Sequence, residues 1–412
     1  MKGNLKKTYN LLTMSMMLML VVIVVFVVSC AKDDDIHNGR TVLYPEFVNN
    51  SMVNASTKAL TQAEADTYHN NLAPATRVFA YAVNKDSGAE SHGKQPIISG
   101  RFTKKSGTII AGDAEWNSNL EIENAVYDIY GLGTYGIGNI TNVTHTATAS
   151  GTTLDAVISG ISVATQYDPT VSVAAAKKTS DESTIEQDLT LGSFEFDNTT
   201  GNENKVYMAM KHLYAQANIL FKSDPVYNEL RTIEITGVSV SSQDKTGLTF
   251  SFSSNALPTA TWTTPLTTGT EDSFDLPHKK LTVSAGVQSM EDITYPIVLN
   301  PTTAKEAGSF RFVPLLKTID GVQLIPVSIT VSYNIYRYEL DEHDEPYTDQ
   351  AHFIRSSSAT NSRILTFVDP QRNINRGAPA QGNNYNITIK VAPTYLYVLA
   401  DDDADFKLEL EE

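Results

Sequence analysis

The feature of this sequence that most constrains its fold is an alternation of apolar and polar residues with a period of two. In residues 329–335 and 385–391, every second residue is Ile, Val or Tyr, and those between are polar. Such a run forms a strand that buries one face and exposes the other. Shorter runs recur along the chain, usually bounded by Gly, Pro, Asn or Asp. The sequence therefore predicts an all-β protein built from antiparallel β-sandwiches.

One longer run changes phase along its length. Its apolar positions are even-numbered from Val206 to Met210 and odd-numbered from Ala215 to Phe221. One extra residue in a strand shifts the phase in this way. The run therefore predicts a long strand with a β-bulge near His212.

The N-terminus carries a secretory signal. Three lysines without an acidic neighbour precede the apolar run 18–28, which is followed by Ser29 and Cys30. This order is typical of a signal peptide, here residues 1–29, and the run is shorter than the roughly 20 apolar residues that cross a bilayer. A cysteine directly after the small residue resembles a bacterial lipobox, so Cys30 is the predicted lipidation site. The alternatives are ordinary cleavage to a soluble protein and a short transmembrane anchor.

Residues 30–40 form the predicted lipidated tether. Cys30 is the only cysteine in the chain, so no intramolecular disulfide is possible. Residues 32–35 are a lysine followed by three aspartates. This segment resembles the short tag that directs Bacteroidetes lipoproteins to the outer face of the outer membrane, although a solvated linker would have the same composition. The resemblance implies a surface-exposed lipoprotein.

The mature chain is strongly acidic. Removing residues 1–29 takes away three lysines and no acidic residue, which leaves a formal charge of −19. Nucleic acids and anionic membrane surfaces are recognised through clustered Lys and Arg. We therefore exclude nucleic acid as a partner.

The mature length of 383 residues exceeds what one hydrophobic core usually organises. The most polar and turn-rich link in the middle of the chain is residues 198–204. It places the expected boundary between an N-terminal sandwich, residues 41–203, and a C-terminal sandwich, residues 204–412.

Two glycine motifs match nucleotide sites in sequence but not in context. Gly131, Gly133 and Gly136 spell G-x-G-x-x-G, yet a threonine-rich segment follows where the helix should begin. Residues 88–94 spell G-x-x-x-x-G-K, yet Gln95 stands where a Ser or Thr would bind magnesium. Both are interpreted as loops between strands, and no cofactor is expected.

The sequence predicts neither a metal site nor an enzyme. Asp401, Asp403 and Asp405 have calcium-loop spacing, but Phe406 occupies the position that needs glycine. The chain has no G-x-S-x-G and no H-E-x-x-H motif. His343 stands among acidic residues and is interpreted as an exposed hairpin tip. A carboxylate pair for glycoside hydrolysis depends on spatial pairing that the sequence does not show.

Several segments resemble the fimbrillin family of Bacteroidetes, which comprises fimbrial subunits and related adhesins. Residues 211–221 are similar to the His-x-x-Ala segment at the start of a fimbrillin C-terminal domain. Residues 374–376 and 384–391 resemble the family's late turn and tyrosine-containing strand, and residues 76–81 match an early strand of its N-terminal domain. The shared organisation covers nearly the whole mature chain.

The resemblance implies two transthyretin-like sandwiches, no catalysis, and assembly by donor-strand exchange after cleavage behind an arginine. In such exchange, a missing edge strand leaves a groove that a neighbouring subunit's strand fills. Arg40 and Arg77 are the candidate processing sites. The implied partners are other fimbrial subunits, the outer membrane through the lipid on Cys30, and ligands on host or bacterial surfaces. Many family members end in a Trp-containing strand, whereas this chain does not, so its position in a fibre stays open.

Both ends of the mature chain are expected to take part in the exchange. Residues 41–45 are typical of a short edge strand that its proline ends. Cleavage after Arg77 would remove this strand, whereas cleavage after Arg40 would keep it. Residues 395–399 and 406–410 alternate and lie at a free chain end, so they are the predicted donor.

A cell-surface glycan-binding lipoprotein is the alternative function. In that case exposed aromatic side chains would stack on sugar rings. The candidates are Trp116, Trp262, Tyr395 and Tyr397. Their other interpretation is that they belong to the hydrophobic core.

We predict that Cys30→Ala abolishes acyl labelling and releases the protein from the membrane fraction, because no other residue can accept the lipid. Metabolic labelling with a fatty-acid analogue, followed by fractionation, measures both effects. Retention of the variant in membranes would contradict lipidation at Cys30.

Overall fold

The computed structural model describes most of the chain beyond the tether. The described residues are 36–37, 40–47, 77–85, 97–105, 116–135, 141–148, 151–166, 168–177, 194–199, 204–253, 257–263, 267–284, 287–393 and 406–411. Among them, no helix combines the length and apolar character needed to span a membrane.

The first large sheet has the strand order β3-β13-β11-β8-β4-β5-β6, with β12 also paired to β8. Neighbouring strands are antiparallel, except that β3 runs parallel to β13. Strands β3 and β6 at the two ends of the order lie close together, so the sheet curls until its edges meet. The strands are β3 (Tyr44–Phe47), β4 (Arg77–Asn84), β5 (Ile97–Lys104), β6 (Trp116–Ser118), β8 (Val126–Tyr135), β11 (Asp168–Lys177), β12 (Glu195–Asp197) and β13 (Lys205–His212).

The second large sheet has the order β25-β24-β15-β10-β9, with β16, β17 and β20 also paired to β15. Its central strand, β15, is 23 residues long. The strands are β9 (Thr141–Thr148), β10 (Gly151–Ile161), β15 (Arg231–Ser253), β16 (Thr259–Trp262), β17 (Thr267–Asp275), β20 (Ile297–Val298), β24 (Ser328–Arg337) and β25 (Phe353–Asn361).

A third sheet packs against β15 and β24 with the order β21-β14-β28-β29. Its strands are β14 (Ala215–Ser223), β21 (Lys305–Phe312), β28 (Asn384–Pro393) and β29 (Phe406–Glu411). Three small sheets complete the fold: β1 (Ile36–His37), β2 (Arg40–Val42) and β7 (Glu121–Ile122); β18 (Lys279–Ser284) and β19 (Val287–Asp292); β22 (Lys317–Ile319), β23 (Val322–Leu324), β26 (Thr366–Asp369) and β27 (Ile374–Asn375).

Helical structure is confined to two short segments of the described chain, the 3₁₀ turn η2 (Val163–Thr165) and the single-turn helix α4 (Pro225–Asn228). The α4 turn begins at Asp224, whose carboxylate accepts the Val226 and Tyr227 amides, with Pro225 in the first turn. The expectation of an all-β protein with sheets packed as sandwiches is confirmed.

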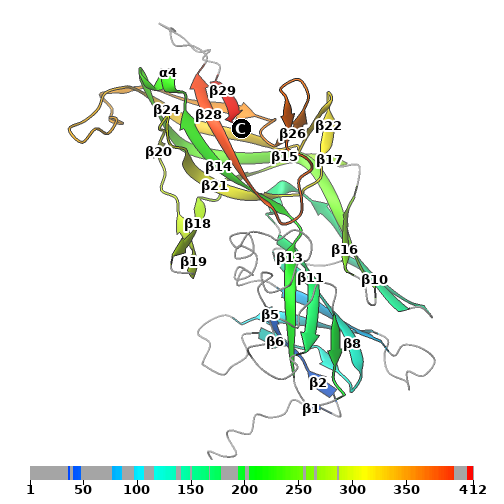
Figure 1. Ribbon diagram of the computed structural model, residues 1–412. Helices are drawn as coiled ribbons and strands as arrows, with labels where there is room; N and C mark the ends of the chain where they lie inside the picture. The colour runs from blue at the N-terminus through cyan, green and yellow to red at the C-terminus, as the bar shows by residue number, and fades with distance from the viewer. Residues whose placement is uncertain are drawn as a thin grey trace, which may run out of the picture.

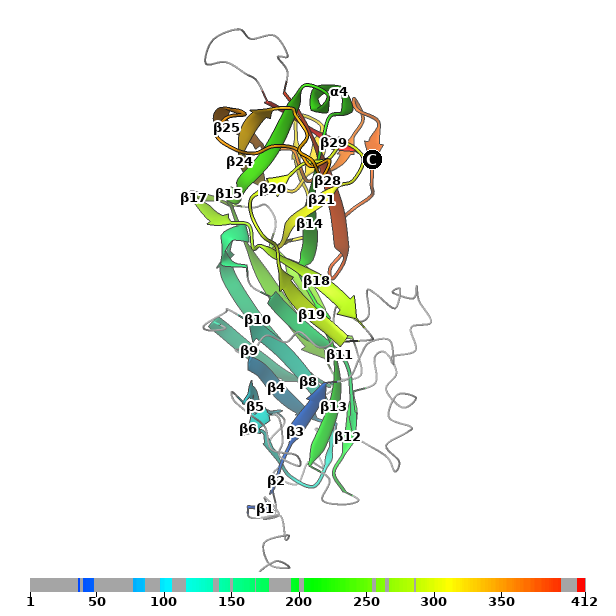
Figure 2. The same cartoon turned by 90° about the vertical axis from the view of Figure 1, so that its left-hand side faces the viewer.

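The sheets enclose two hydrophobic cores that lie end to end in an elongated molecule (Figures 1 and 2). Strand β15 supplies Ile233 and Val240 to the C-terminal core and Phe250 to the N-terminal core. One continuous strand thus belongs to both sandwiches.

The phase change near His212 marks a passage between the two cores. Strand β13 ends at His212 and β14 begins at Ala215, in a different sheet. The even-numbered Met208 packs in the N-terminal core, and the odd-numbered Ile219 packs in the C-terminal core. The alternation was interpreted correctly as strand, but the predicted single strand with a bulge is wrong, because the chain changes sheets there.

The expected boundary after residue 203 does not coincide with the division of the packing. Strand β13 follows that boundary, yet it pairs with β11 and β3, and Met208 lies in the N-terminal core. The end of β15, including Phe250, also lies in that core. The two sandwiches are therefore distinguished by the core in which each strand packs, and β13 and the end of β15 belong to the N-terminal core.

The glycine motif at residue 131 lies within a strand instead of the predicted loop. Gly131 and Gly133 belong to β8. A Cβ atom on Gly133 would overlap the Thr170 hydroxyl oxygen, and one on Gly131 would lie 2.6 Å from the Met208 methyl carbon. These glycines therefore leave room for side chains of β11 and β13. Gly136 and the motif 88–94 lie outside the described residues.

We predict that Gly100→Ala destabilises the protein by about 1–3 kcal/mol, because overpacking forces backbone to move. A Cβ atom there would lie 2.5 Å from the Leu120 Cα. The matched control is Gly237→Ala in β15, where the added Cβ meets no atom within 4 Å. Urea unfolding of both variants measures the difference, and equal midpoints would contradict the close approach of β5 to Leu120.

Candidate functional site

The predicted site residues fall in three parts of the chain. Cys30 lies outside the described residues. Arg40 begins β2 in the small sheet with β1 and β7, and Arg77 begins β4 in the first large sheet. The structure therefore places the two candidate processing sites on different sheets.

Arg40 is exposed to solvent, but both its backbone and its side chain contact neighbouring residues. It pairs with His37 across the β1–β2 hairpin, and its guanidinium contacts a Glu123 carboxylate oxygen at 3.1 Å. A surface ion pair of this kind contributes about 1 kcal/mol or less. The bond after Arg40 leads directly to Thr41, which is buried and pairs with Ile122. A protease would need local opening of this hairpin to reach the bond.

Arg77 is the exposed first residue of a strand that is otherwise largely buried. Its neighbour Val78 is fully buried and pairs with Phe102 on one side and Gly133 on the other. Cleavage after Arg77 would therefore require the start of β4 to separate from both β5 and β8.

Residues 41–47 form a seam that closes the curled N-terminal sheet. Thr41 and Val42 pair with β7, and the Leu43 amide donates to the Leu120 carbonyl at 2.9 Å. The Tyr44 amide then donates to the Asn204 carbonyl at 2.6 Å, and β3 continues along β13. This seam strand (residues 41–47) therefore passes from one edge of the sheet to the other.

The inner face of the seam strand is formed by its odd-numbered residues. Thr41, Leu43 and Pro45 are buried, and Leu43 is fully enclosed in the N-terminal core. Phe47 packs edge-on against Trp116, with ring centroids 4.8 Å apart. The seam strand is therefore anchored by every second side chain.

The expectation that the proline ends this strand is wrong, because β3 extends to Phe47. Along β3 the amides alternate in direction, and the Tyr44 amide points toward β13. The missing amide of Pro45 therefore faces away from β13, which an edge strand tolerates. On its outer side Glu46 forms an exposed ion pair with Lys205 at 3.1 Å.

The tryptophans proposed for sugar stacking lie in the core. Trp116 is 4% exposed and Trp262 is 9% exposed, and both belong to the N-terminal core. Trp262 packs against Tyr214 with ring centroids 5.6 Å apart. Tyr395 and Tyr397 lie outside the described residues. The two tryptophans therefore do not form an exposed platform for glycans.

The histidine interpreted as a hairpin tip lies where it was expected. His343 is exposed, and its amide donates to the Asp341 carboxylate in a turn closed by the Leu340–Pro346 bridge. The predicted acidic turn at residues 401–405 lies outside the described residues. Within the described chain no group of three or more His, Cys, Asp or Glu side chains is arranged to hold a metal ion.

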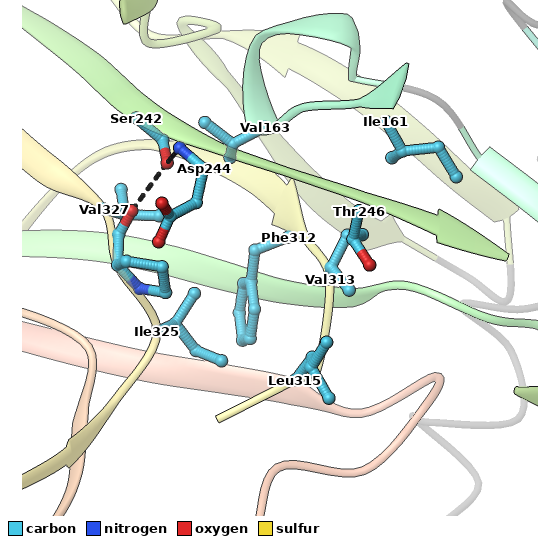
Figure 3. A pocket seen from close by; sticks show the side chains of 11 residues that line it. Ile161, Val163, Ser242, Asp244, Thr246, Phe312, Val313, Leu315, Ile325 and Val327 are labelled. Atoms are coloured by element: carbon cyan, nitrogen blue, oxygen red, sulfur yellow. Dashed lines mark hydrogen bonds between the residues drawn. The ribbon is translucent and has the colours of Figure 1, made fainter. Parts of the chain in front are cut away.

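A small cavity lies where the two sandwiches meet (Figure 3). It measures about 30 Å³, enough for one or two water molecules. The Ser242 hydroxyl donates to the Pro326 carbonyl at 2.7 Å, and Lys317 contacts the Asp244 carboxylate at 2.8 Å. The cavity is therefore part of the junction and is too small for an organic ligand.

A residue that the sequence did not single out is His352, which contacts two carboxylates. Its imidazole lies 2.6 Å from Asp349 and 3.1 Å from Glu339. In the sequence, this contact could have been anticipated from the spacing of Asp349 and His352, which are three residues apart and follow the end of a strand.

We predict that Leu43→Ala lowers the free energy of unfolding by about 2–5 kcal/mol, as expected for a fully buried leucine. The matched control is Val42→Ala in the same strand, whose half-buried side chain should matter less. Chemical unfolding followed by tryptophan fluorescence measures both variants, since Trp116 and Trp262 lie in this core. Equal losses would mean that the seam strand is not anchored by its inner face.

No family model matches this chain, and no curated protein matches it. Among solved structures it is similar to a fimbrial protein of Bacteroides vulgatus, with 12% identity and a TM-score of 0.39 over 90% of this chain and 98% of the other. It is also similar to a candidate cell adhesion protein of Bacteroides uniformis, with 12% identity and a TM-score of 0.32 over 91% and 99%. A third is the fimbrial anchor protein Mfa2 of Porphyromonas gingivalis, with 12% identity and a TM-score of 0.24 over 89% and 94%. The structural neighbours of this chain are thus fimbrial and candidate adhesion proteins of Bacteroidales.

Proposed function

We propose that the mature chain is a surface-exposed fimbrial subunit or fimbria-associated adhesin, held in the outer membrane through lipid on Cys30. Its partners are other fimbrial subunits, joined by strand exchange, and ligands on host or bacterial surfaces. It uses no cofactor and performs no catalysis. The proposal combines the signal sequence and the fimbrillin resemblance with the geometry of the seam strand.

The observation that carries the proposal is that the seam strand precedes Arg77 in the chain and closes the N-terminal sheet. Cleavage after Arg77 would leave residues 41–47 attached to their sandwich only by noncovalent contacts. Their loss would expose the Leu120–Ile122 edge on one side and the β13 edge on the other. The resulting groove would be apolar at the position of Leu43 and would have unpaired backbone groups along both sides.

The groove sets requirements for an incoming strand. The strand should run parallel to β13, as β3 does, with an apolar side chain at every second position. An acidic residue facing outward would replace Glu46 beside Lys205. Residues 406–411 of a neighbouring copy meet these requirements, because Phe, Leu and Leu alternate there with Lys, Glu and Glu.

Donation by this segment requires release from its own sheet. Strand β29 pairs antiparallel with β28, from Pro393↔Phe406 to Thr388↔Glu411. It is the terminal strand of that sheet, so its removal breaks one ladder of hydrogen bonds. The other predicted donor segment, residues 395–399, lies outside the described residues.

We predict that an assembling subunit is cut after Arg77 and that a subunit serving as anchor is cut after neither arginine. N-terminal sequencing of the protein recovered from surface filaments tests this. A terminus at Val78 supports the exchange, whereas a terminus at Thr41 limits proteolysis to release from the lipid. An intact acylated Cys30 throughout the filaments would overturn the proposed step.

Matched variants separate the two sites. Arg77→Ala should keep the protein out of filaments while leaving its membrane anchoring unchanged, because the seam strand stays covalently attached. Arg40→Ala should leave incorporation unchanged. Equal incorporation of both variants would show that cleavage after Arg77 is not part of assembly.

A further inference from the structure

The connection between β24 and β25 contains a histidine whose two ring nitrogens both face carboxylates. We call residues 338–352 the distal loop, because it projects beyond the ends of these strands (Figure 1). The His352 Nδ1 atom lies 2.6 Å from an Asp349 carboxylate oxygen, and its Nε2 atom lies 3.1 Å from a Glu339 carboxylate oxygen. The imidazole is 15% exposed, whereas the Asp349 and Glu339 carboxylates are 53% and 60% exposed.

Counting protons identifies the state of this histidine. A neutral imidazole has one N–H donor, and an ionised carboxylate can only accept. Hydrogen bonds from both nitrogens to two carboxylates therefore require the doubly protonated imidazolium. We infer that His352 is a pH-sensitive brace of the distal loop, closed when the imidazole is protonated and released when it is neutral.

The stacking partner of the imidazole favours the same state. The Tyr347 ring lies parallel to it, with centroids 4.5 Å apart and an angle of 4° between the planes. A cation over an aromatic face is attracted by the electrons of the ring. The Tyr347 amide also donates to the Glu339 carbonyl at 3.0 Å, which holds Tyr347 beside the start of the loop.

The other charged groups near His352 do not provide a substitute for its contacts with the two carboxylates. Arg337 at the end of β24 contacts the loop through backbone, since its amide donates to the His352 carbonyl and its guanidinium to the Ala351 carbonyl. Arg355 of β25 acts on the Tyr227 and Tyr333 hydroxyls. The distal loop itself has six acidic residues and no Lys or Arg. Loss of the imidazolium charge would leave these carboxylates to repel one another.

The direction of the pH effect follows from the contacts. The hydrogen bond to Asp349, with the smaller contribution of Glu339, raises the pKa of His352 against the opposing effect of desolvation. Because the folded pKa is raised, the brace is complete below the ordinary pKa of histidine and is lost as pH rises through the raised value. The hydrogen bond from His352 lowers the pKa of Asp349, so that carboxylate stays ionised well into the acid range.

The test is a histidine NMR titration of the full mature chain, combined with hydrogen exchange of the distal loop at pH 6 and pH 9, corrected for intrinsic rates. His352 should titrate above the ordinary pKa of histidine, because its two carboxylate partners favour the imidazolium. For each pH unit by which the pKa of His352 in the closed loop exceeds its pKa in the open loop, the ratio of closed to open loop should fall about tenfold between acid and alkaline pH.

Three variants make the outcome decisive. His343→Gln is the matched control and should keep the pH dependence of loop protection. His352→Gln should leave the loop equally open at both pH values. Glu339→Gln keeps the histidine and should lower its pKa, which tests the brace even if His352→Gln folds poorly. Titration of His352 at or below the ordinary pKa of histidine, or loop protection that is independent of pH in the unmodified protein, would overturn the inference.

Discussion

The fold depends on one strand that is shared by two cores. Strand β15 carries Ile233 and Val240 in the C-terminal core and Phe250 in the N-terminal core, and between these positions it crosses the junction. A strand cannot leave its backbone groups unpaired while it crosses, so β24, β17, β10 and β16 pair with it in turn. The long strand therefore fixes the relative position of the two sandwiches.

A second connection reinforces the first. Gln166 adopts a left-handed backbone conformation with φ of 45°, and its side-chain amide pairs with backbone of β21 as a strand would. Its nitrogen donates to the Arg311 carbonyl at 3.0 Å, and its oxygen accepts from the Arg311 amide at 2.9 Å. The neighbouring Val163 packs in the C-terminal core. Two elements far apart in sequence thus join the sandwiches.

The sequence predicted the strands well because a half-buried strand must alternate, and residues 329–335 and 385–391 do so without interruption. The domain boundary could not be found in the same way. Polar composition marks where the chain meets water, whereas β13 shows that a strand can follow a polar link and still return to the earlier core. The change of phase at His212 was visible, but a bulge and a change of sheets produce the same pattern.

The seam strand was predicted in outline because its chain position and alternation are local properties. Its extension through Pro45 was missed, since the sequence does not say which side of a proline faces the neighbouring strand. The His352 brace was missed for a related reason. His343 has more acidic neighbours in sequence, yet it lies on an exposed turn, whereas a strand end and a turn bring Glu339 and Asp349 to His352.

The two terminal strands differ in how they are held, and this difference bears on the proposed exchange. Strand β29 pairs through one ladder, to β28, so its release breaks one ladder of hydrogen bonds. The seam strand pairs with two neighbours in succession, first with residues 120–122 and then with β13, and its Leu43 is enclosed in the core. Spontaneous release of the seam strand would expose two edges and an apolar groove at once. In the proposed exchange, a covalent cut and an incoming strand together would overcome this cost, because the cut would make the departure irreversible and the new strand would pair with the exposed edges. In the proposed exchange, the C-terminal strand would therefore be the donor, and the groove vacated by the seam strand would be the acceptor.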